Sequence, residues 1–192
     1  DQRKISQLNL TYYKDFLVQY DQTYHSKWRT WIQALAEMDV SVTHAKNALE
    51  YGYVRPQLIS HSSSYVSMVS MRHPIIERLN LKNSYVSNSV SLGKDRSGLL
   101  LYGINAAGKS SLMKAIGLNV LMAQSGMFVA CESMELAPYH HLFTRILSHD
   151  NLYQGHSTFT VEMLELRNIL QRCDASSLIL GDELCSGTES VS

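Results

Sequence analysis

Residues 99–111 read Leu99-Leu100-Leu101-Tyr102-Gly103-Ile104-Asn105-Ala106-Ala107-Gly108-Lys109-Ser110-Ser111. The first four residues form an apolar run ending in glycine, which predicts a buried parallel strand. After Lys109, apolar side chains recur at helical spacing. The stretch from Gly103 to Ser110 matches the pattern GxxxxGK[ST] in the strand–loop–helix context that this motif requires. It therefore predicts a phosphate-binding loop, with a ligand-free glycine turn before a helix as the alternative.

The residue types of this loop suit the phosphates of a nucleotide. Gly103 and Gly108 let the backbone curl so that N–H groups point inward at phosphate oxygens, and the following helix directs its positive end at the same anion. Lys109 is expected to reach the β- and γ-phosphates, and Ser110 to ligate Mg²⁺. We therefore expect ATP and Mg²⁺ as ligands. The expected nucleotide-binding residues of the loop are Gly103, Ile104, Asn105, Ala106, Ala107, Gly108, Lys109, Ser110 and Ser111.

A second half of the site is predicted where another apolar strand, residues 177–181, ends in two acids. Asp182 would hold Mg²⁺ directly or through water, and Glu183 would orient or polarise the attacking water. An apolar strand ending in acids is common at protein surfaces, but the phosphate loop makes the catalytic interpretation dominate. The acid pair favours hydrolysis and so predicts a Mg²⁺-dependent ATPase.

Strands and helices alternate from about residue 84, which predicts an α/β domain with a mainly parallel sheet. The expected strands are 99–102, 127–131, 142–147 and 177–181, and the expected helices are 111–125 and 158–171. A shorter strand is expected at 65–69, beyond a boundary rich in turn residues.

Residues 1–51 contain neither Gly nor Pro, and their apolar side chains follow a helical stripe. The stripe consists of Trp28, Trp31, Leu35, Met38, Val42, Ala45 and Leu49. It predicts a long helix that packs on a neighbour, with a break near Asp39 or a coiled-coil arm as alternatives.

The composition excludes several classes of protein. The 192 residues carry 17 Lys and Arg against 17 Asp and Glu, so there is no global field for nucleic acid. The sequence contains no apolar run of the roughly 18 residues needed to span a bilayer. Three widely spaced cysteines favour a reducing, intracellular setting. Because the chain starts at Asp1 without Met and stops soon after the acid pair, we expect a fragment of a longer protein.

Five further motifs occur in order along the chain. They are Arg72-His73-Pro74-Ile75-Ile76-Glu77, Tyr85-Val86-Ser87-Asn88, Phe143-Thr144-Arg145-Ile146, Ser157-Thr158-Phe159-Thr160-Val161-Glu162-Met163, and Asp182-Glu183 followed by Gly187-Thr188. Together with the phosphate loop they resemble the ATPase domain of MutS, the DNA mismatch-repair family, from about residue 31 to residue 188. The resemblance implies a P-loop NTPase domain of the ABC type over 57–192, preceded by an α-helical lever and clamp-base segment over 1–56.

The resemblance also implies roles for single residues. Tyr85 would stack on adenine, with Val86 beside it offering backbone hydrogen bonds. Asn105 would help to order the γ-phosphate or its water, acting with Glu183. Ser157 and Thr158 would act in trans, at the nucleotide of a partner subunit, whereas Arg72-His73-Pro74 would be structural.

Two segments depart from the family pattern. Ala106-Ala107 stands where the family usually has Met-Gly, and Leu184-Cys185-Ser186 follows the acid pair in place of Ile-Gly-Arg. Alanine keeps its N–H donor, so nucleotide binding should survive the first change. The second removes a glycine and a positive charge from the dimer-facing loop.

As a whole, the resemblance implies a protein that couples its nucleotide state to mismatched DNA through a dimeric clamp. Its partners would be mismatched double-stranded DNA, bound mostly by domains outside this stretch, and a second MutS-like subunit, with no membrane. We expect it to be intracellular and DNA-associated, and residues 1–192 alone to hydrolyse ATP poorly. The alternatives are a MutS paralogue acting on DNA junctions or stalled ribosomes, and a non-hydrolysing nucleotide-binding scaffold subunit.

Overall fold

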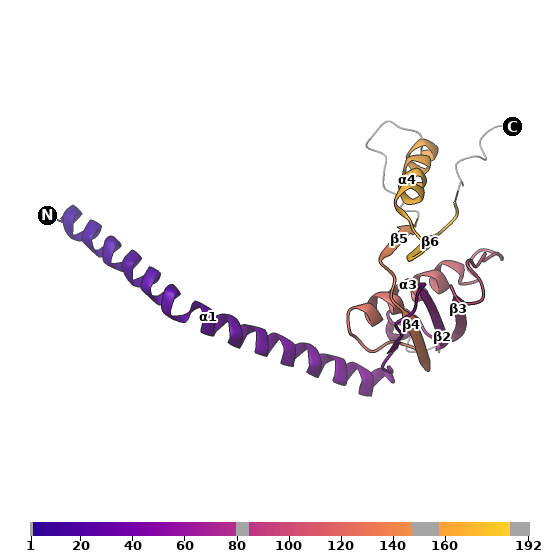
Figure 1. Cartoon of the computed structure of the whole chain (residues 1–192), viewed down its shortest axis with the longest axis horizontal. Coiled ribbons are helices and arrows are strands. Elements are labelled where there is room, and N and C mark those ends of the chain that lie inside the picture. Colours follow the sequence, from indigo (N-terminus) through magenta and orange to yellow (C-terminus); the bar gives the residue numbers. More distant parts are fainter. Residues whose placement is uncertain (1, 80–84, 147–157, 185–192) are drawn as a thin grey trace. The chain divides into compact units, whose positions relative to one another are not determined.

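A computed structural model of the chain describes residues 2–79, 85–146 and 158–184. The chain divides into two compact units, Asp1–Lys46 and Asn47–Ser192. Helix α1 (Gln2–Tyr51) runs through the first unit and contributes its last turns to the second (Figure 1). The helix continues through Asp39 because neither glycine nor proline interrupts it before Gly52.

No residue of α1 is buried within the chain. The apolar stripe predicted from the sequence is therefore exposed, with 66% of Trp31 and 61% of Leu35 accessible to solvent. None of the helices in the described part of the chain is long and apolar enough to cross a membrane.

The second unit is built on a four-stranded sheet. Its strands are β1 (Gln57–Leu58), β2 (Tyr65–Met71), β3 (Asn88–Leu92) and β4 (Ser133–Ala137), in the order β1-β4-β2-β3. The central strand β2 is antiparallel to both β3 and β4, whereas β1 is parallel to β4. The alternating burial along β2 places Val66 and Met68 on the core face, as expected for a strand with one covered face.

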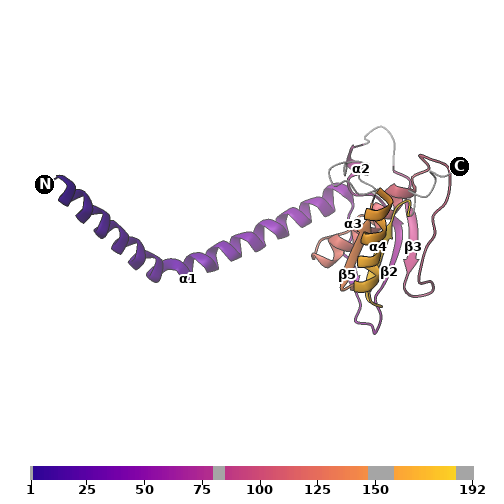
Figure 2. The ribbon, with the colours of Figure 1, turned by 90° about the horizontal axis from the view of Figure 1, so that it is seen from above.

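A separate pair of strands forms a β–α–β unit. Strands β5 (His141–Arg145) and β6 (Ser177–Gly181) pair in parallel, and helix α4 (Thr158–Arg172) lies between them in the chain and runs beside β5 (Figures 1 and 2). Arg145 of β5 forms an ion pair with Glu165 of α4, with 2.8 Å between Nε and Oε2.

Helix α3 (Lys109–Gln124) joins the two sheets in one hydrophobic core. The short helix α2 (Ile76–Leu79) has no buried residue. The buried side chains of α3 include Met113, Ile116 and Val120, which pack in the same cluster as side chains of β2, β4 and β6. Gly117 allows close approach, because a Cβ atom there would lie 2.5 Å from Cδ1 of Leu180 in β6. The core thus fixes the helix that follows the predicted phosphate loop.

The expectation of an ABC-type P-loop NTPase domain with a mainly parallel sheet is wrong for this structure. The fold is mixed α/β with small sheets, and within the described residues parallel pairing is confined to β1 with β4 and β5 with β6. Residues 99–102, predicted as a buried strand, pair with no described strand, and 87% of Leu100 and 91% of Tyr102 are exposed. An apolar run becomes a buried strand only where neighbouring strands accept its backbone hydrogen bonds.

Residues 127–131 also fail to form the predicted strand. Val129 makes one isolated antiparallel bridge to Val54, and the regular strand β4 begins two residues after Cys131. The predicted helices at 111–125 and 158–171 and the strand at 177–181 are confirmed within a few residues.

Candidate functional site

The loop from Gly103 to Gly108 turns the chain into the start of α3. Gly108 has a φ of 92°, in the left-handed region that favours glycine, and Ala106 has a φ of 64° despite its Cβ atom. A non-glycine residue in this region costs about 1–2 kcal/mol. A backbone N–H to C=O bond of 3.3 Å from Ala107 to Ile104 closes the turn. Backbone strain of this kind is concentrated at functional sites.

Helix α3 begins directly after this loop and carries no side-chain cap. Its N-cap residue is Gly108, and the N–H of Leu112 donates to the Gly108 carbonyl oxygen at 2.9 Å. The N–H groups of the first turn therefore have neither an intrahelical acceptor nor a side-chain acceptor. Together with the helix dipole they form an arrangement suited to an anion.

The ammonium group of Lys109 lies across the loop. Its Nζ donates to the carbonyl oxygens of Gly103 at 2.7 Å and Ile104 at 2.9 Å. An ammonium has three donors, so one remains for a further acceptor. The loop thus presents a cation and the first turn of a helix at one place, and these residues fit the phosphates of a nucleotide.

Tyr85 reaches the first turn of α3 from a distant part of the chain. Its hydroxyl oxygen lies 3.4 Å from the hydroxyl oxygen of Ser111, and either group can donate. The half-buried Tyr85 ring lies beside the ring of His73, with 6.4 Å between centroids. The structure therefore brings one predicted adenine-binding residue to the predicted phosphate site, whereas Val86 is 79% exposed and Asn105 lies on the exposed loop.

The acid pair lies at the end of β6. The backbone N–H of Asp182 donates to the Arg145 carbonyl oxygen at 2.8 Å, and Glu183 is exposed with a φ of 47°. In the described part of the chain, no hydrogen bond or ion pair joins either acid to residues 103–111. Magnesium binding by Ser110 and Asp182 therefore stays a prediction.

Of the two residues predicted to act in trans, one belongs to the described part of the chain. Thr158 is the first residue of α4, and Ser157 lies outside the described residues. Of the described residues, no group of three or more His, Cys, Asp and Glu side chains has the arrangement of a metal site.

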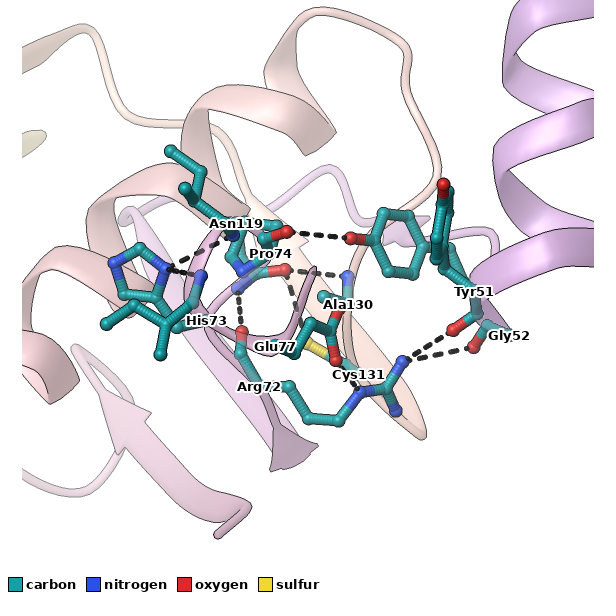
Figure 3. A network of polar contacts seen from close by, with 12 residues as sticks. Tyr51, Gly52, Arg72, His73, Pro74, Glu77, Asn119, Ala130 and Cys131 are labelled. Carbon is teal, nitrogen blue, oxygen red and sulfur yellow. Dashed lines mark hydrogen bonds and ion pairs between the residues drawn. The ribbon is translucent and has the colours of Figure 1, made fainter. Parts of the chain in front are cut away.

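The segment from Arg72 to Glu77 forms a network of polar contacts (Figure 3). Arg72 pairs with Glu77, with 2.6 Å between Nε and Oε2, and its Nη2 donates to the Tyr51 carbonyl oxygen at 2.9 Å. His73 accepts the backbone N–H groups of Ile75 and Ile76 at Nδ1, at 3.3 Å and 3.2 Å. Burial lowers the pKa of His73, and the nearby Lys114 lowers it further. The ring is therefore neutral, as an acceptor at Nδ1 requires.

Asn119 of α3 completes this network and was missed by the sequence reasoning. The side chain is fully buried; its Nδ2 donates to the Arg72 carbonyl oxygen at 3.0 Å, and its Oδ1 accepts the Ala130 N–H at 2.8 Å. Burial raises the pKa of the neighbouring Cys131 thiol to about 12, so it stays protonated. The signal was present in the sequence, because Asn119 stands three residues after Ile116 on the apolar face of α3.

Comparisons with known proteins identify the relatives of this sequence. The family described as MutS domain V matches residues 99–192. The mitochondrial DNA mismatch repair protein mutS homolog of Sarcophyton glaucum is 42% identical over 162 residues, which cover 82% of this chain and 16% of that protein. The DNA mismatch repair protein MutS of Chlorobaculum tepidum is 42% identical over 161 residues, which cover 83% of this chain and 18% of that protein.

A third relative, the DNA mismatch repair protein MutS of Brevibacillus brevis, is 43% identical over 157 residues. The match covers 81% of this chain and 18% of that protein. The chain thus spans less than a fifth of the length of these relatives.

Proposed function

We propose that this chain, which belongs to the MutS family, binds ATP at residues 103–111 and hydrolyses it as part of a MutS-like DNA mismatch-repair protein. One observation carries the proposal: the loop delivers the Lys109 ammonium and the uncapped first turn of α3 to the same place. The position of Tyr85 beside Ser111 supports an adenine ring next to this loop. We therefore propose ATP as the anion that this loop binds.

Each residue of the proposed site has a distinct task. The N–H groups of residues 103–111 and the Lys109 ammonium bind the phosphates, and the face of Tyr85 holds the base, with Val86 at its edge. Ser110 and Asp182 are the residues that would hold Mg²⁺, which neutralises phosphate charge when bound. Glu183 orients the attacking water, and Asn105 holds it near the γ-phosphate.

The names of the relatives support a role in DNA mismatch repair. We propose that mismatched double-stranded DNA is bound mainly outside residues 1–192, since the chain itself carries no net charge. In this proposal the protein works as a dimer, and Ser157 and Thr158 of one subunit complete the nucleotide site of the other. The bound nucleotide then determines how tightly the dimer binds DNA.

A pair of lysine variants of the native protein tests the proposal. Lys109→Ala should abolish Mg·ATP binding in calorimetry, because the charge that faces the β- and γ-phosphates is lost. Lys114→Ala is the matched control, since this exposed lysine lies on the same helix and should leave the affinity unchanged. Equal affinities of Lys109→Ala and the parent would refute the proposal. ATP binding by the parent without turnover would favour the non-hydrolysing scaffold.

A further inference from the structure

The end of α1 is held by an arginine from another part of the chain. Nη2 of Arg72 donates to the Tyr51 carbonyl oxygen at 2.9 Å and lies 3.5 Å from that of Gly52 (Figure 3). These carbonyls belong to the C-terminal end of the helix, which has no intrahelical donors for them. A guanidinium there also faces the negative end of the helix dipole. Arg72 therefore acts as a cap for α1 supplied by the segment after β2.

The same arginine is tied to the helix of the phosphate loop. Asn119, ten residues after Lys109 on α3, donates to the main-chain carbonyl oxygen of Arg72. Asn119 is in turn held by the N–H of Ala130 and by its own helix at Ala115. The hydrogen-bond partners of this buried amide are main-chain groups, apart from the Cys131 thiol. The amide therefore links the position of α3 to the main chain at Arg72.

The geometry also explains why an arginine stands at this position. Its fork holds Glu77 through Nε and the helix carbonyls through Nη2 at the same time. The side chain of Arg72 is 26% exposed and that of Glu77 is 14% exposed, so the pair is largely shielded from water. A lysine would keep the charge but offers a single ammonium without the planar fork.

We propose that Arg72 is a positioning residue that couples nucleotide binding at α3 to the C-terminal end of α1. The proposal rests on the proposed function. Phosphates bound at the start of α3 shift this helix, Asn119 carries the shift to the main chain of Arg72, and the guanidinium changes its hold on the Tyr51 and Gly52 carbonyls. The end of the long helix is then tightened or released according to the nucleotide.

Arg78 makes a second contact to the same turn, which any test must separate from the first. Its guanidinium lies 3.7 Å from the centroid of the Tyr51 ring, and its Nη2 donates to Asn47 Oδ1 at 3.3 Å. In the described part of the chain, Arg78 forms no hydrogen bond with α3. Arg78→Lys should therefore alter the exchange of this turn without removing its response to nucleotide.

Hydrogen–deuterium exchange of the native protein tests the coupling. Peptides covering residues 47–53 should change their exchange rate about fivefold or more on addition of Mg·ATP, the lower end of coupling between sites. Arg72→Lys should lose this response and keep the ATP affinity of the parent in calorimetry. The exposed Arg55→Lys is the matched control and should keep both. Urea unfolding of each variant shows whether it is folded, and Asn119→Ser, which replaces the linking amide with a shorter hydroxyl, should reproduce the loss.

The outcomes separate the two proposals. A parent that binds ATP without any change at residues 47–53, or an Arg72→Lys variant that responds like the parent, overturns the coupling and leaves ATP binding intact. A parent that does not bind Mg·ATP overturns the proposed function and the coupling with it.

Discussion

The hydroxyl oxygens of Tyr85 and Ser111 lie 3.4 Å apart although 26 residues separate them in the chain. Ser111 belongs to the first turn of α3, so this contact sets the distance between the Tyr85 ring and the phosphate loop. His73 supports the same ring, with 6.4 Å between centroids. An adenine on the Tyr85 face would therefore keep a fixed relation to phosphates bound at the loop.

Replacing Tyr85 separates the work of its ring from that of its hydroxyl. Tyr85→Ala should weaken ADP binding by about 1–3 kcal/mol if the ring stacks on the base. Tyr85→Phe keeps the stacking face and loses only the hydrogen bond to Ser111, so its loss should be smaller. Calorimetric titration with ADP measures both. Equal affinity of Tyr85→Ala and the parent would place the adenine elsewhere.

The buried Asn119 amide offers a test of stability. Asn119→Ala leaves the Ala130 N–H and the Arg72 carbonyl without their partner, and an unsatisfied buried group costs about 1–3 kcal/mol. Urea unfolding should therefore give a lower free energy of unfolding. Asn168→Ala, on the exposed face of α4, is the control and should stay within about 0.5 kcal/mol of the parent. A loss at Asn119 no larger than at Asn168 would contradict the role of the network.

Local patterns account for part of this fold. Helices α3 and α4 follow from apolar periodicity and strand β6 from a short apolar run, because their own residues carry these patterns. The pairing of β2 with β4 joins Tyr65 to Ala137, and such long-range register is not encoded in any short window. The apolar run at 99–102 predicted a buried strand, but a short window does not show which strand would pair with it. In the structure this run pairs with no described strand.

The residues of the candidate site likewise fall into those predicted from local sequence and those placed by tertiary structure. The loop motif locates Lys109 correctly at the start of a helix, because the motif and the helix are adjacent in the sequence. The contact between Tyr85 and Ser111 depends on tertiary structure, and only the family resemblance pointed to Tyr85. Neither the loop motif nor the family resemblance pointed to Asn119, although a polar side chain on the apolar face of a helix is a signal that the sequence contains.

Protonation of His73 predicts a pH dependence of stability. Its pKa is lowered from the ordinary value of 6.5, mainly by burial, with Lys114 lowering it and Glu77 raising it. Below about pH 6.5 the His73 side chain takes up a proton in the unfolded chain. In the folded protein its lowered pKa makes this protonation less favourable. The unfolded state then binds more protons, so the free energy of unfolding falls as the pH falls through this range and is unaffected above it.

His73→Gln should therefore flatten the pH dependence between pH 7 and pH 5. One proton accounts for at most about 1.4 kcal/mol per pH unit, which bounds the change in slope. Urea unfolding at several pH values measures it, with the exposed His61→Gln as control. If both variants keep the slope of the parent, His73 does not titrate as its burial indicates.

Glu183→Gln separates nucleotide binding from hydrolysis. The change removes the group that orients water but leaves Asp182 for Mg²⁺, so affinity for Mg·ATP should be retained. Turnover should fall about 100-fold or more, as expected when a general base is lost. Asp95→Asn replaces an exposed acid outside the site and should turn over at the parental rate. Parental turnover by Glu183→Gln would remove Glu183 from the mechanism.

The most direct test is a crystal structure of the native protein with Mg²⁺ and a non-hydrolysable ATP analogue. We expect the triphosphate against the backbone N–H groups of residues 103–111, with Lys109 Nζ on its β- and γ-phosphates. We also expect the adenine on the face of Tyr85 and Mg²⁺ at the Ser110 hydroxyl. Electron density for the nucleotide at any other place, with Lys109 still bonded only to the carbonyls of Gly103 and Ile104, would contradict this expectation.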